Sequence, residues 1–388
     1  MKKIAVVTAT RAEYGLLSPV IKELRKQESD ELTVELIVTG THLSTEYGYT
    51  VREIEADKIR IDERVAVSVA STSAIDISNN QAEVLKKFAE LFEIKRYSAV
   101  LLLGDRYEIF AVAIAAGNSG TPIFHLCGGD TTEGAVDEWI RHSITKMSFL
   151  HFVTNEESRH RVLQLGEDVK RVFNYGSTSI DNILRLAVLS REETLKNIGL
   201  PYCNYAVCTY HPVTMDPDDI EGKIQNFLEA IRCFPKIEFI VTKSNADQGG
   251  AKINKLLEEA SKKIENLHVF ASLGAARYLS LLRYAAFVLG NSSSGIIEAP
   301  VFHIPTVNIG DRQKGRLQAE SIINCKEEKE AIVKAITLSL TETFKEHCKS
   351  VQSPYGDGNA AEKIAKKVLE VVKNKKIDLK KKFYDIYT

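Results

Sequence analysis

The sequence has no apolar run of membrane-spanning length and no excess of charge of either sign. Its 51 lysine and arginine residues nearly balance 52 aspartate and glutamate residues, which leaves a formal net charge of −1. The first absence argues against a transmembrane segment, and the second argues against a large nucleic-acid or membrane footprint. We therefore expect no nucleic-acid or membrane partner, and any anionic ligand must be held by a few well-placed arginine and histidine residues.

The sequence also lacks a CxxC motif and any cysteine spacing typical of a zinc site, although it contains six cysteines. Scattered free thiols are typical of the reducing cytoplasm, and we expect a cytoplasmic location. The first apolar run stops at Val7 and is followed by Arg11 and Glu13. This pattern predicts a first strand rather than a signal peptide. No internal repeat or low-complexity segment stands out.

A length of 388 residues is too long for one ordinary core, so we expect two domains. Strand-like and helix-like segments alternate without interruption up to Ser179, which predicts a doubly wound α/β domain. A second alternation begins at Tyr205–Thr209 and predicts another such domain. We place the N-terminal domain over residues 1–180 and the C-terminal domain over residues 181–359, with a cleft between them.

The main candidates for chemistry are acids that follow successive strands. Val100–Leu103 is a continuous apolar run, which is typical of a strand buried on both faces, and Asp105 follows it. The next short strand, Pro122–Leu126, is followed by Asp130, and Asp137 opens the helix after that. Open α/β sheets bind ligands at the carboxyl ends of their strands. We therefore expect the three acids to meet at one edge of the first sheet.

Each of these acids also has a structural interpretation. Asp105 could simply pair with Arg106 or cap a helix, and Asp137 could be an ordinary helix N-cap. Both roles are common in isolation, but three acids from successive strand ends favour a functional site. Two further candidates stay open at this point. Arg11 could bind a phosphate near a helix N-terminus or be a surface arginine, and His42 could line the cleft or be structural.

In the second half, the loop Gly290–Gly295 contains three consecutive serines after an apolar strand. Small residues let backbone N–H groups approach an anion, so Ser292 and Ser293 are candidates for a phosphate site. An N-cap cluster is the alternative, and the loop is not a GxxxxGKS nucleotide motif. Glu298 would lie one turn inside the following helix, suited to ribose hydroxyls. The cationic loop around Arg312 could help to neutralise a diphosphate. The lysine-rich segment up to Lys382 is expected to be a solvated surface.

Taken together, several motifs resemble the hydrolysing UDP-N-acetylglucosamine 2-epimerases, and they occur in the right order along almost the whole chain. A close branch of this family acts on UDP-diacetylbacillosamine. The resemblance implies a glycosyltransferase-B-like fold of two Rossmann-like domains, with the last helix, in residues 360–388, packing back on the first domain. The motifs are TATRAEYG, LGDRYE, GGDTTEGAVDEWIRHSITK, YHPVT, GNSSSGIIE, NIGDRQKGR and SPYGDGNA.

The resemblance also implies roles for individual residues. The catalytic set comprises Asp105, Asp130, Glu133, Asp137 and His211. The substrate-binding set comprises Arg11, Arg106, His42, Asn245, Ser292, Ser293, Glu298 and Arg312. One position departs from the family, because this chain has Cys127 where some relatives carry a glutamate three positions before the last acid of the motif. Asp130 is then the expected substitute, with Glu133 behind it.

The implied reaction removes the C2 proton of the sugar as UDP leaves C1, which gives a glucal, and water then adds with inverted configuration at C2. We expect a UDP-sugar substrate, no cofactor, no metal and a homo-oligomer, either a dimer or a tetramer. Three alternatives remain. They are a non-hydrolysing epimerase with the same pocket, a glycosyltransferase of the same fold, and a non-catalytic UDP-sugar sensor.

Overall fold

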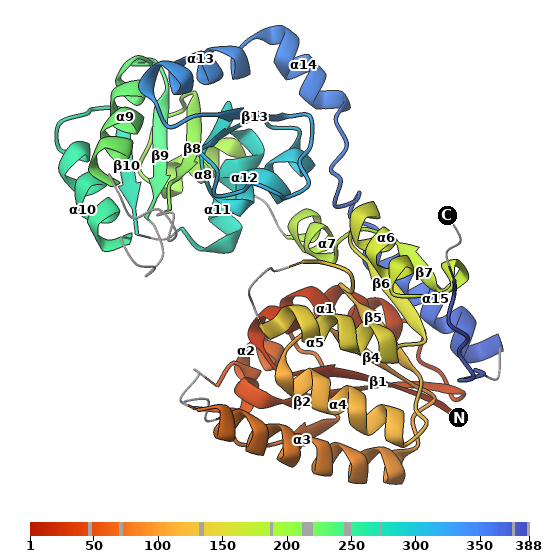
Figure 1. Cartoon of the computed structure of the whole chain (residues 1–388). Helices are drawn as coiled ribbons and strands as arrows, with labels where there is room; N and C mark the ends of the chain where they lie inside the picture. The colour runs from red at the N-terminus through yellow and green to blue at the C-terminus, as the bar shows by residue number, and fades with distance from the viewer. Residues whose placement is uncertain are drawn as a thin grey trace. The chain divides into compact units, whose positions relative to one another are not determined.

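The computed structural model describes residues 1–45, 49–69, 73–131, 136–186, 189–211, 220–243, 250–271, 273–374 and 377–385. The chain divides into two compact units, one made of residues 1–184 and 355–388 and the other of residues 185–354. Each unit contains one parallel sheet with helices packed on it (Figure 1). The predicted α/β class with two doubly wound, Rossmann-like halves is confirmed.

The sheet of the first unit has the strand order β3-β2-β1-β4-β5-β6-β7. Its strands run in parallel because each connection returns through a helix or loop on a face of the sheet. The order reverses between β1 and β4, so this sheet has a switch point where its carboxyl ends can receive a ligand. The strands are β1 (Lys2–Thr8), β2 (Leu32–Thr39), β3 (Glu63–Val65), β4 (Ala99–Leu103), β5 (Ile123–Leu126), β6 (Leu150–Val153) and β7 (Val172–Asn174).

Helices cover both faces of this sheet, which explains why β4 is apolar and buried along its whole length. Helices α3, α4 and α5 lie side by side on one face, and α1 packs with α15 in the core of the other (Figure 1). The helical elements are α1 (Arg11–Arg25), η1 (Gly40–Leu43), α2 (Val51–Ala56), α3 (Ala74–Lys95), α4 (Tyr107–Asn118), α5 (Val136–Met147), α6 (Glu156–Gln164), η2 (Val169–Arg171), α7 (Thr178–Arg185) and α15 (Ala360–Asn374).

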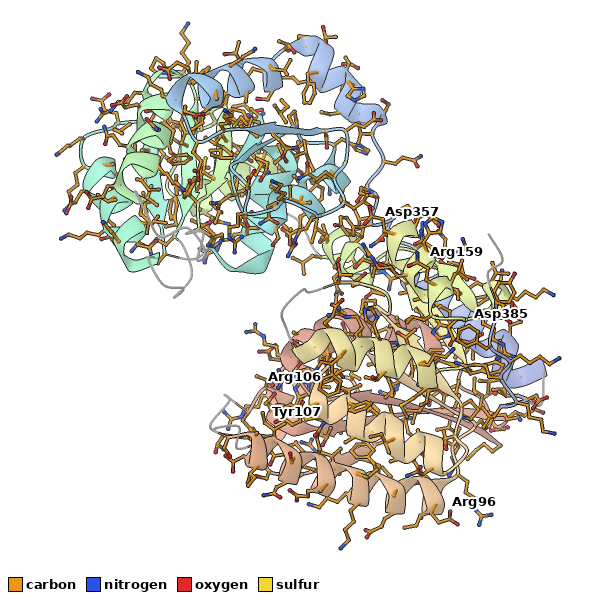
Figure 2. All side chains as sticks on the ribbon, viewed as in Figure 1. Arg96, Arg106, Tyr107, Arg159, Asp357 and Asp385 are labelled. Atoms are coloured by element: carbon orange, nitrogen blue, oxygen red, sulfur yellow. The ribbon has the colours of Figure 1, made fainter. Side chains whose placement is uncertain are left out.

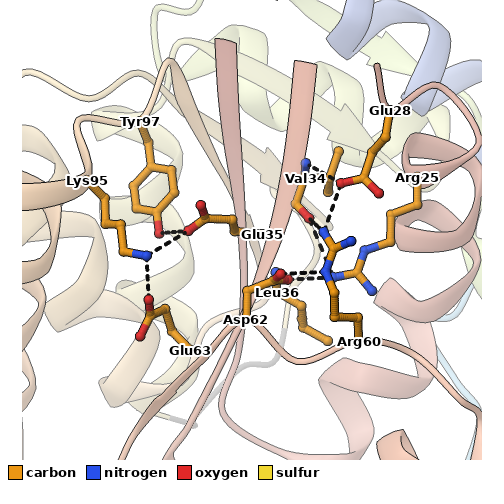
Figure 3. A network of polar contacts seen from close by, with 10 residues as sticks. All are labelled: Arg25, Glu28, Val34, Glu35, Leu36, Arg60, Asp62, Glu63, Lys95 and Tyr97. Carbon is orange, nitrogen blue, oxygen red and sulfur yellow. Dashed lines mark hydrogen bonds and ion pairs between the residues drawn. The ribbon is translucent and has the colours of Figure 1, made fainter. Parts of the chain in front are cut away.

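The edge of the sheet at β3 is held by ion pairs and hydrogen bonds around β2 (Figure 3). Asp62, which precedes β3, accepts from the Leu36 amide at 2.8 Å and from Arg25 at 2.7 Å. Glu35 accepts from the Tyr97 hydroxyl at 2.7 Å. Lys95 lies 3.5 Å from Glu35 and links it to Glu63 of β3. A three-residue strand has few ladder bonds, and these side chains supplement them.

The second unit repeats the arrangement with the strand order β10-β9-β8-β11-β12-β13, again all parallel. Its switch point lies between β8 and β11. The strands are β8 (Tyr205–Thr209), β9 (Glu238–Thr242), β10 (Leu267–Phe270), β11 (Phe287–Gly290), β12 (Thr306–Ile309) and β13 (Ile322–Cys325). The helical elements are α8 (Arg191–Asn197), α9 (Ile220–Arg232), α10 (Gly250–Ser261), α11 (Gly274–Tyr284), α12 (Ser293–Ile297), η3 (Ala299–Phe302), α13 (Lys329–Ser339) and α14 (Glu342–Ser350).

The C-terminal segment belongs to the first unit. Asp181, fully buried in α7, accepts from the amides of Ala360 and Ala361 at 3.2 and 3.0 Å and so holds the first turn of α15. Beyond α15, Lys381 donates to the buried carboxylate of Glu167 at 2.8 and 2.7 Å. The expectation of a wholly solvated lysine-rich segment is therefore wrong at Lys381. In the described part of the chain, no helix is both long and apolar enough to cross a membrane.

Candidate active site

Two of the acids predicted from the sequence, Asp105 and Asp130, are joined by one arginine of the first unit. Asp105 follows β4, Asp130 follows β5, and Asp137 lies in the first turn of α5. Arg141, one turn further along α5, is only 4% exposed. It donates to Asp105 Oδ2 from Nε at 2.8 Å and to the carbonyl oxygen of Asp130 at 2.6 Å. It also pairs with Glu138 at 3.0 Å.

The pKa of Asp105 is shifted by its surroundings. Burial raises the pKa of its carboxyl group, Arg141 opposes the shift, and the negative charges of Asp137 and Asp130 add to it. Asp105 therefore lies within electrostatic range of both of these carboxylates. A carboxyl group with a raised pKa, held by a buried guanidinium, is suited to taking and returning a proton. The alternative partner, Arg106, does not hold Asp105 in place, because it pairs with Glu108 instead, at 3.2 Å.

The loop after β5, which carries Asp130, has an unusual backbone conformation. Cys127 has φ 63° and Gly129 has φ 82°, so the chain turns sharply within this loop. A Cβ atom on Gly129 would lie 2.2 Å from the carbonyl oxygen of Ser158, and only glycine fits there. The pKa of the Cys127 thiol is raised by burial and by the charges of Asp130 and Asp105. This thiol is therefore neutral at physiological pH and does not replace a carboxylate. Glu133 lies outside the described residues.

Two predicted arginines stand at the same edge of the sheet. Arg11 begins α1 directly after the β1 loop, and its side chain is 73% exposed and pairs with Glu53 at 2.9 Å. Arg106 precedes α4 and lies 5.5 Å from the ring of Tyr107 (Figure 2). Both follow strands that flank the switch point, β1 and β4.

His42 lies in the interior of the first unit, fully buried. Its Nε2 lies 3.1 Å from Thr8 Oγ1 and its Nδ1 lies 2.9 Å from Thr50 Oγ1. Burial lowers its pKa to about 4, so the ring is neutral at physiological pH. Both ring nitrogens are engaged with protein hydroxyls, which favours the structural interpretation of His42 over a direct ligand contact.

Glu13 is a further buried acid, which the sequence pattern did not indicate, and it forms a capping box with Thr10 at the start of α1. Its Oε2 accepts from the Ala9 amide at 2.7 Å and from the Thr10 amide at 3.2 Å. Its buried Oε1 has no hydrogen-bond partner among the described residues. Burial raises the pKa of Glu13 to about 8, and the charge of Glu108 contributes. A mostly protonated carboxyl group therefore lies against the Ala9 and Thr10 amides at the start of α1.

In the second unit, Asn291 joins three of the predicted loops. Its Oδ1 accepts from the His211 amide at 2.7 Å, and its Nδ2 donates to the His211 carbonyl oxygen at 2.8 Å. Its own carbonyl oxygen accepts from Arg312 at 3.1 Å and from Gln313 at 2.8 Å. The backbone at Gly290 has φ 137°, and a Cβ atom there would lie 2.0 Å from the Thr209 carbonyl oxygen. His211 and Arg312 are thus brought together at the switch point of the second sheet.

The serine loop Gly290–Gly295 provides the N-cap of a helix, which was one of its two interpretations. Ser292 caps α12 and accepts from the Ser294 amide at 3.3 Å, while Ser293 is the first residue of the helix. Glu298 accepts a hydrogen bond from the Ser294 hydroxyl, and the Tyr278 hydroxyl donates to Ser294 at 2.8 Å. Burial raises the pKa of Glu298. Asn245 lies outside the described residues.

The sequence analysis did not single out Arg141, which joins Asp105 to Asp130. It also did not single out Asn291, which joins His211 to Arg312. The available signal for Arg141 was its spacing, since it follows Asp137 by four residues and Glu138 by three on one helix face. For Asn291 the signal was its place directly after Gly290 at the end of a buried strand. In the described part of the chain, no group of three or more His, Cys, Asp or Glu residues is arranged to hold a metal ion.

Solved structures share this two-unit fold. The UDP-GlcNAc 2-epimerase of Neisseria meningitidis, determined with UDP-GlcNAc bound, is similar with a TM-score of 0.79 and 20% identity, covering 96% of this chain and all of the other (100%). The UDP-GlcNAc 2-epimerase of Methanocaldococcus jannaschii has a TM-score of 0.77 and 17% identity, covering 95% and 100%. At these identities the likeness concerns the fold.

The family model for UDP-N-acetylglucosamine 2-epimerase matches residues 22–369. This chain therefore belongs to the UDP-N-acetylglucosamine 2-epimerase family, and the prediction made from the motifs is confirmed. It is 39% identical to the polysialic acid biosynthesis protein P7 of Escherichia coli, over 100% of this chain and 98% of the relative. It is also 39% identical to a hydrolysing GDP/UDP-N,N'-diacetylbacillosamine 2-epimerase of Campylobacter jejuni, over 83% and 84%.

Proposed function

We propose that this protein is a hydrolysing 2-epimerase that converts UDP-N-acetylglucosamine and water to N-acetylmannosamine and UDP, for sialic-acid-type sugar biosynthesis. The observation that carries the proposal is the cluster in which Arg141 joins Asp105 to the Asp130 loop at the switch point. Relatives at 39% and 34% identity are named as hydrolysing enzymes, which supports the hydrolysing branch. A binding protein or sensor for the same sugar would not need several carboxyl groups beside the phosphate contacts.

The first half of the reaction is an elimination. The hydrogen on C2 is not next to a carbonyl group in the pyranose ring, so its removal must be coupled to departure of UDP from C1. We assign the base to Asp105, which takes the C2 proton as the C1–O bond breaks and the C1=C2 bond forms. The electron pair leaves with the diphosphate, whose growing negative charge is stabilised by preorganised cations. Arg11 and Arg106 are the candidates in the first unit.

The second half is the addition of water to the glucal. A proton returns to C2 from the face that inverts its configuration, and hydroxide from water bonds to C1. We assign Asp130 and Asp137 to this step, as the groups that orient and deprotonate the water. Glu133 stays a second candidate for the same role. Close carboxylates share protons readily, because the charge of one disfavours ionisation of the next.

We place the nucleotide in the second unit. His211 and Arg312, both bonded to Asn291, would meet the diphosphate, together with Ser292 and Ser293 at the start of α12. Glu298 would accept hydrogen bonds from the ribose hydroxyls, and Asn245 would bind UDP as in the family motif. We propose further that the enzyme acts in the cytoplasm as a homo-oligomer and needs neither a cofactor nor a metal ion.

UDP-N,N'-diacetylbacillosamine is the second candidate substrate. Relatives named for this substrate come from Campylobacter jejuni, at 39% identity, and Legionella pneumophila, at 34% identity over 94% of both chains. A relative from Neisseria meningitidis that is named UDP-N-acetylglucosamine 2-epimerase, 32% identical over 87% of both chains, supports UDP-N-acetylglucosamine. The two sugars differ at C4 and C6, so the preference of the enzyme between them depends on contacts with that side of the ring. The chemistry at C1 and C2 is the same for both.

The test is to incubate the purified enzyme separately with each UDP-sugar and to identify the products by NMR. We expect UDP and free N-acetylmannosamine from UDP-N-acetylglucosamine, at a kcat/KM at least tenfold (about 1.4 kcal/mol) above that for the bacillosamine substrate. The reverse ratio would assign the enzyme to the second substrate. Release of an intact UDP-sugar epimer would identify a non-hydrolysing enzyme, and no turnover of either would refute the proposed function.

A further inference from the structure

Asp130 is held by two hydroxyl groups from a neighbouring connection of the sheet. The Thr154 hydroxyl donates to Asp130 Oδ1 at 3.0 Å, and the Ser158 hydroxyl donates to the same oxygen at 2.5 Å. Thr154 directly follows β6, and Ser158 lies in the first turn of α6. Their residues are only 7% and 1% exposed. Water therefore has little access to these two donors.

The direction of the Thr154 hydrogen bond is set by Asn155, which caps α6. Its Nδ2 donates to Thr154 Oγ1 at 3.0 Å, and its Oδ1 accepts from the Ser158 amide at 2.8 Å. Because an amide N–H group can only donate, the Thr154 oxygen must act as the acceptor in that contact. Its own hydrogen is left for Asp130. Thr154 and Ser158 thus both donate to one oxygen of one carboxylate, while Asn155 orients the Thr154 hydroxyl and binds the backbone amide of Ser158.

We propose that Thr154, Asn155 and Ser158 are positioning residues that fix Asp130 Oδ1 and so present Oδ2 to the water that adds to the glucal. This inference rests on the proposed function, in which Asp130 serves the second half of the reaction. The backbone of the same residue is fixed independently, by Arg141 on its carbonyl oxygen and by the close approach of Gly129 to Ser158. With Oδ1 and the carbonyl oxygen both bound, little rotation of the carboxylate remains.

The arrangement also gives a reason for an aspartate at this position. Aspartate has one fewer rotatable bond than glutamate, so a pair of donors on one oxygen is enough to orient it. The donors lie at the end of β6 and in the first turn of α6, whereas the acid itself sits on a loop. Catalytic groups on loops need such support, because a displacement of about 1 Å can cost about 100-fold in rate.

The experiment compares Thr154→Val, which keeps the shape and loses the hydroxyl, with Thr154→Ser, which keeps the hydroxyl. Ser158→Ala removes the second donor, and Ser148→Ala is the control, since that buried hydroxyl donates to the Ile144 carbonyl oxygen, at 2.7 Å, away from Asp130. For each variant we would measure kcat, KM, UDP affinity, thermal stability and the fraction of turnover released as unsaturated sugar.

We expect T154V and S158A to lower kcat by about 10- to 100-fold, with UDP affinity and KM within about threefold of wild type. The released unsaturated sugar should rise relative to the hydrated product, because elimination is intact and water addition is slow. T154S should retain most of the wild-type kcat, and S148A should leave both kcat and the product ratio unchanged.

Three results would overturn the inference. Wild-type kcat and product ratio in both T154V and S158A, with Asp130→Asn inactive, would leave Asp130 essential and the donors irrelevant. Equal losses of kcat and UDP affinity would mean a general structural defect. Full activity of Asp130→Asn would instead remove Asp130 from the proposed mechanism itself. If S158A does not fold, T154V and T154S decide between these outcomes alone.

Discussion

A substitution at Asp105 can separate an effect on turnover from an effect on UDP binding. Replacement by asparagine keeps the shape and removes the base, so turnover should fall by about two to four orders of magnitude. UDP affinity should change little, because the diphosphate contacts are proposed for other residues. Steady-state kinetics measures the turnover, and titration calorimetry measures the UDP affinity. Parallel loss of UDP binding and rate would show that Asp105 is structural.

Arg141 should control the pH at which Asp105 becomes active. The guanidinium group lowers the pKa of Asp105 against the effect of burial, so its removal leaves that pKa higher still. A base must be ionised to act, and in Arg141→Gln we therefore expect the acid limb of the kcat/KM profile to move to higher pH. Arg141→Lys keeps a charge and should shift the limb less. An unshifted limb in Arg141→Gln would disconnect Arg141 from the base.

Glu13 makes a separate prediction about stability. Its pKa is about 8 in the folded protein, against an ordinary value of 4.5, so between these pH values the folded state binds a proton that the unfolded state has lost. The contribution of Glu13 to the free energy of unfolding should therefore fall as pH rises from about 5 to 8, by at most about 1.4 kcal/mol per pH unit. Glu13→Gln stays neutral and should lack this contribution.

Urea unfolding of both proteins across that range is the measurement. Glu108 and Arg106 are the charged groups that act on Glu13, and both are unchanged in the variant. The difference between the two stability curves therefore isolates the Glu13 proton. Curves that run parallel across the whole range would mean that Glu13 is ionised in the folded protein.

At the scale of elements, Asp181 is the residue that fastens α15 to the first unit. Asp181→Ala would leave the Ala360 and Ala361 amides without their acceptors in a buried position. We expect a loss of about 1–3 kcal/mol in the free energy of unfolding. Asp181→Asn keeps one acceptor oxygen and should lose less. Asp357→Ala is the control, because its pair with Lys363 is on the surface and should be worth under about 1 kcal/mol.

The elements also show which parts of the site could be predicted from sequence. Buried parallel strands such as β4 are uninterrupted apolar runs, so their ends and the acid Asp105 were visible in the pattern. Arg141 was not, because its contact with Asp105 spans 36 residues, and the spacing on its own helix gives its neighbours there but not this partner. Lys381 looked like one more surface lysine, and only the folded chain brings it to Glu167, 214 positions earlier in the sequence.

At the scale of the whole molecule, the reaction itself can be tested by isotopes. Elimination followed by hydration replaces the C2 proton with one from solvent, so the reaction in D₂O should place a single deuterium at C2 of the free sugar. Bond cleavage between C1 and oxygen leaves the phosphorus–oxygen bonds intact. The reaction in H₂¹⁸O should therefore label C1 of the sugar and leave UDP unlabelled. Mass spectrometry and NMR of both products give these assignments.

The C1 label must be measured early, because ring opening of the free sugar exchanges that oxygen with solvent. Each alternative leaves a different pattern. Deuterium at C2 of an intact UDP-sugar would identify a non-hydrolysing epimerase, which shares the first half of the reaction. Heavy oxygen in UDP would mean attack at phosphorus, and the assignment of Asp105 to C2 would be wrong. A free sugar without deuterium and with unchanged C2 configuration would mean simple hydrolysis, a reaction that needs no base at C2.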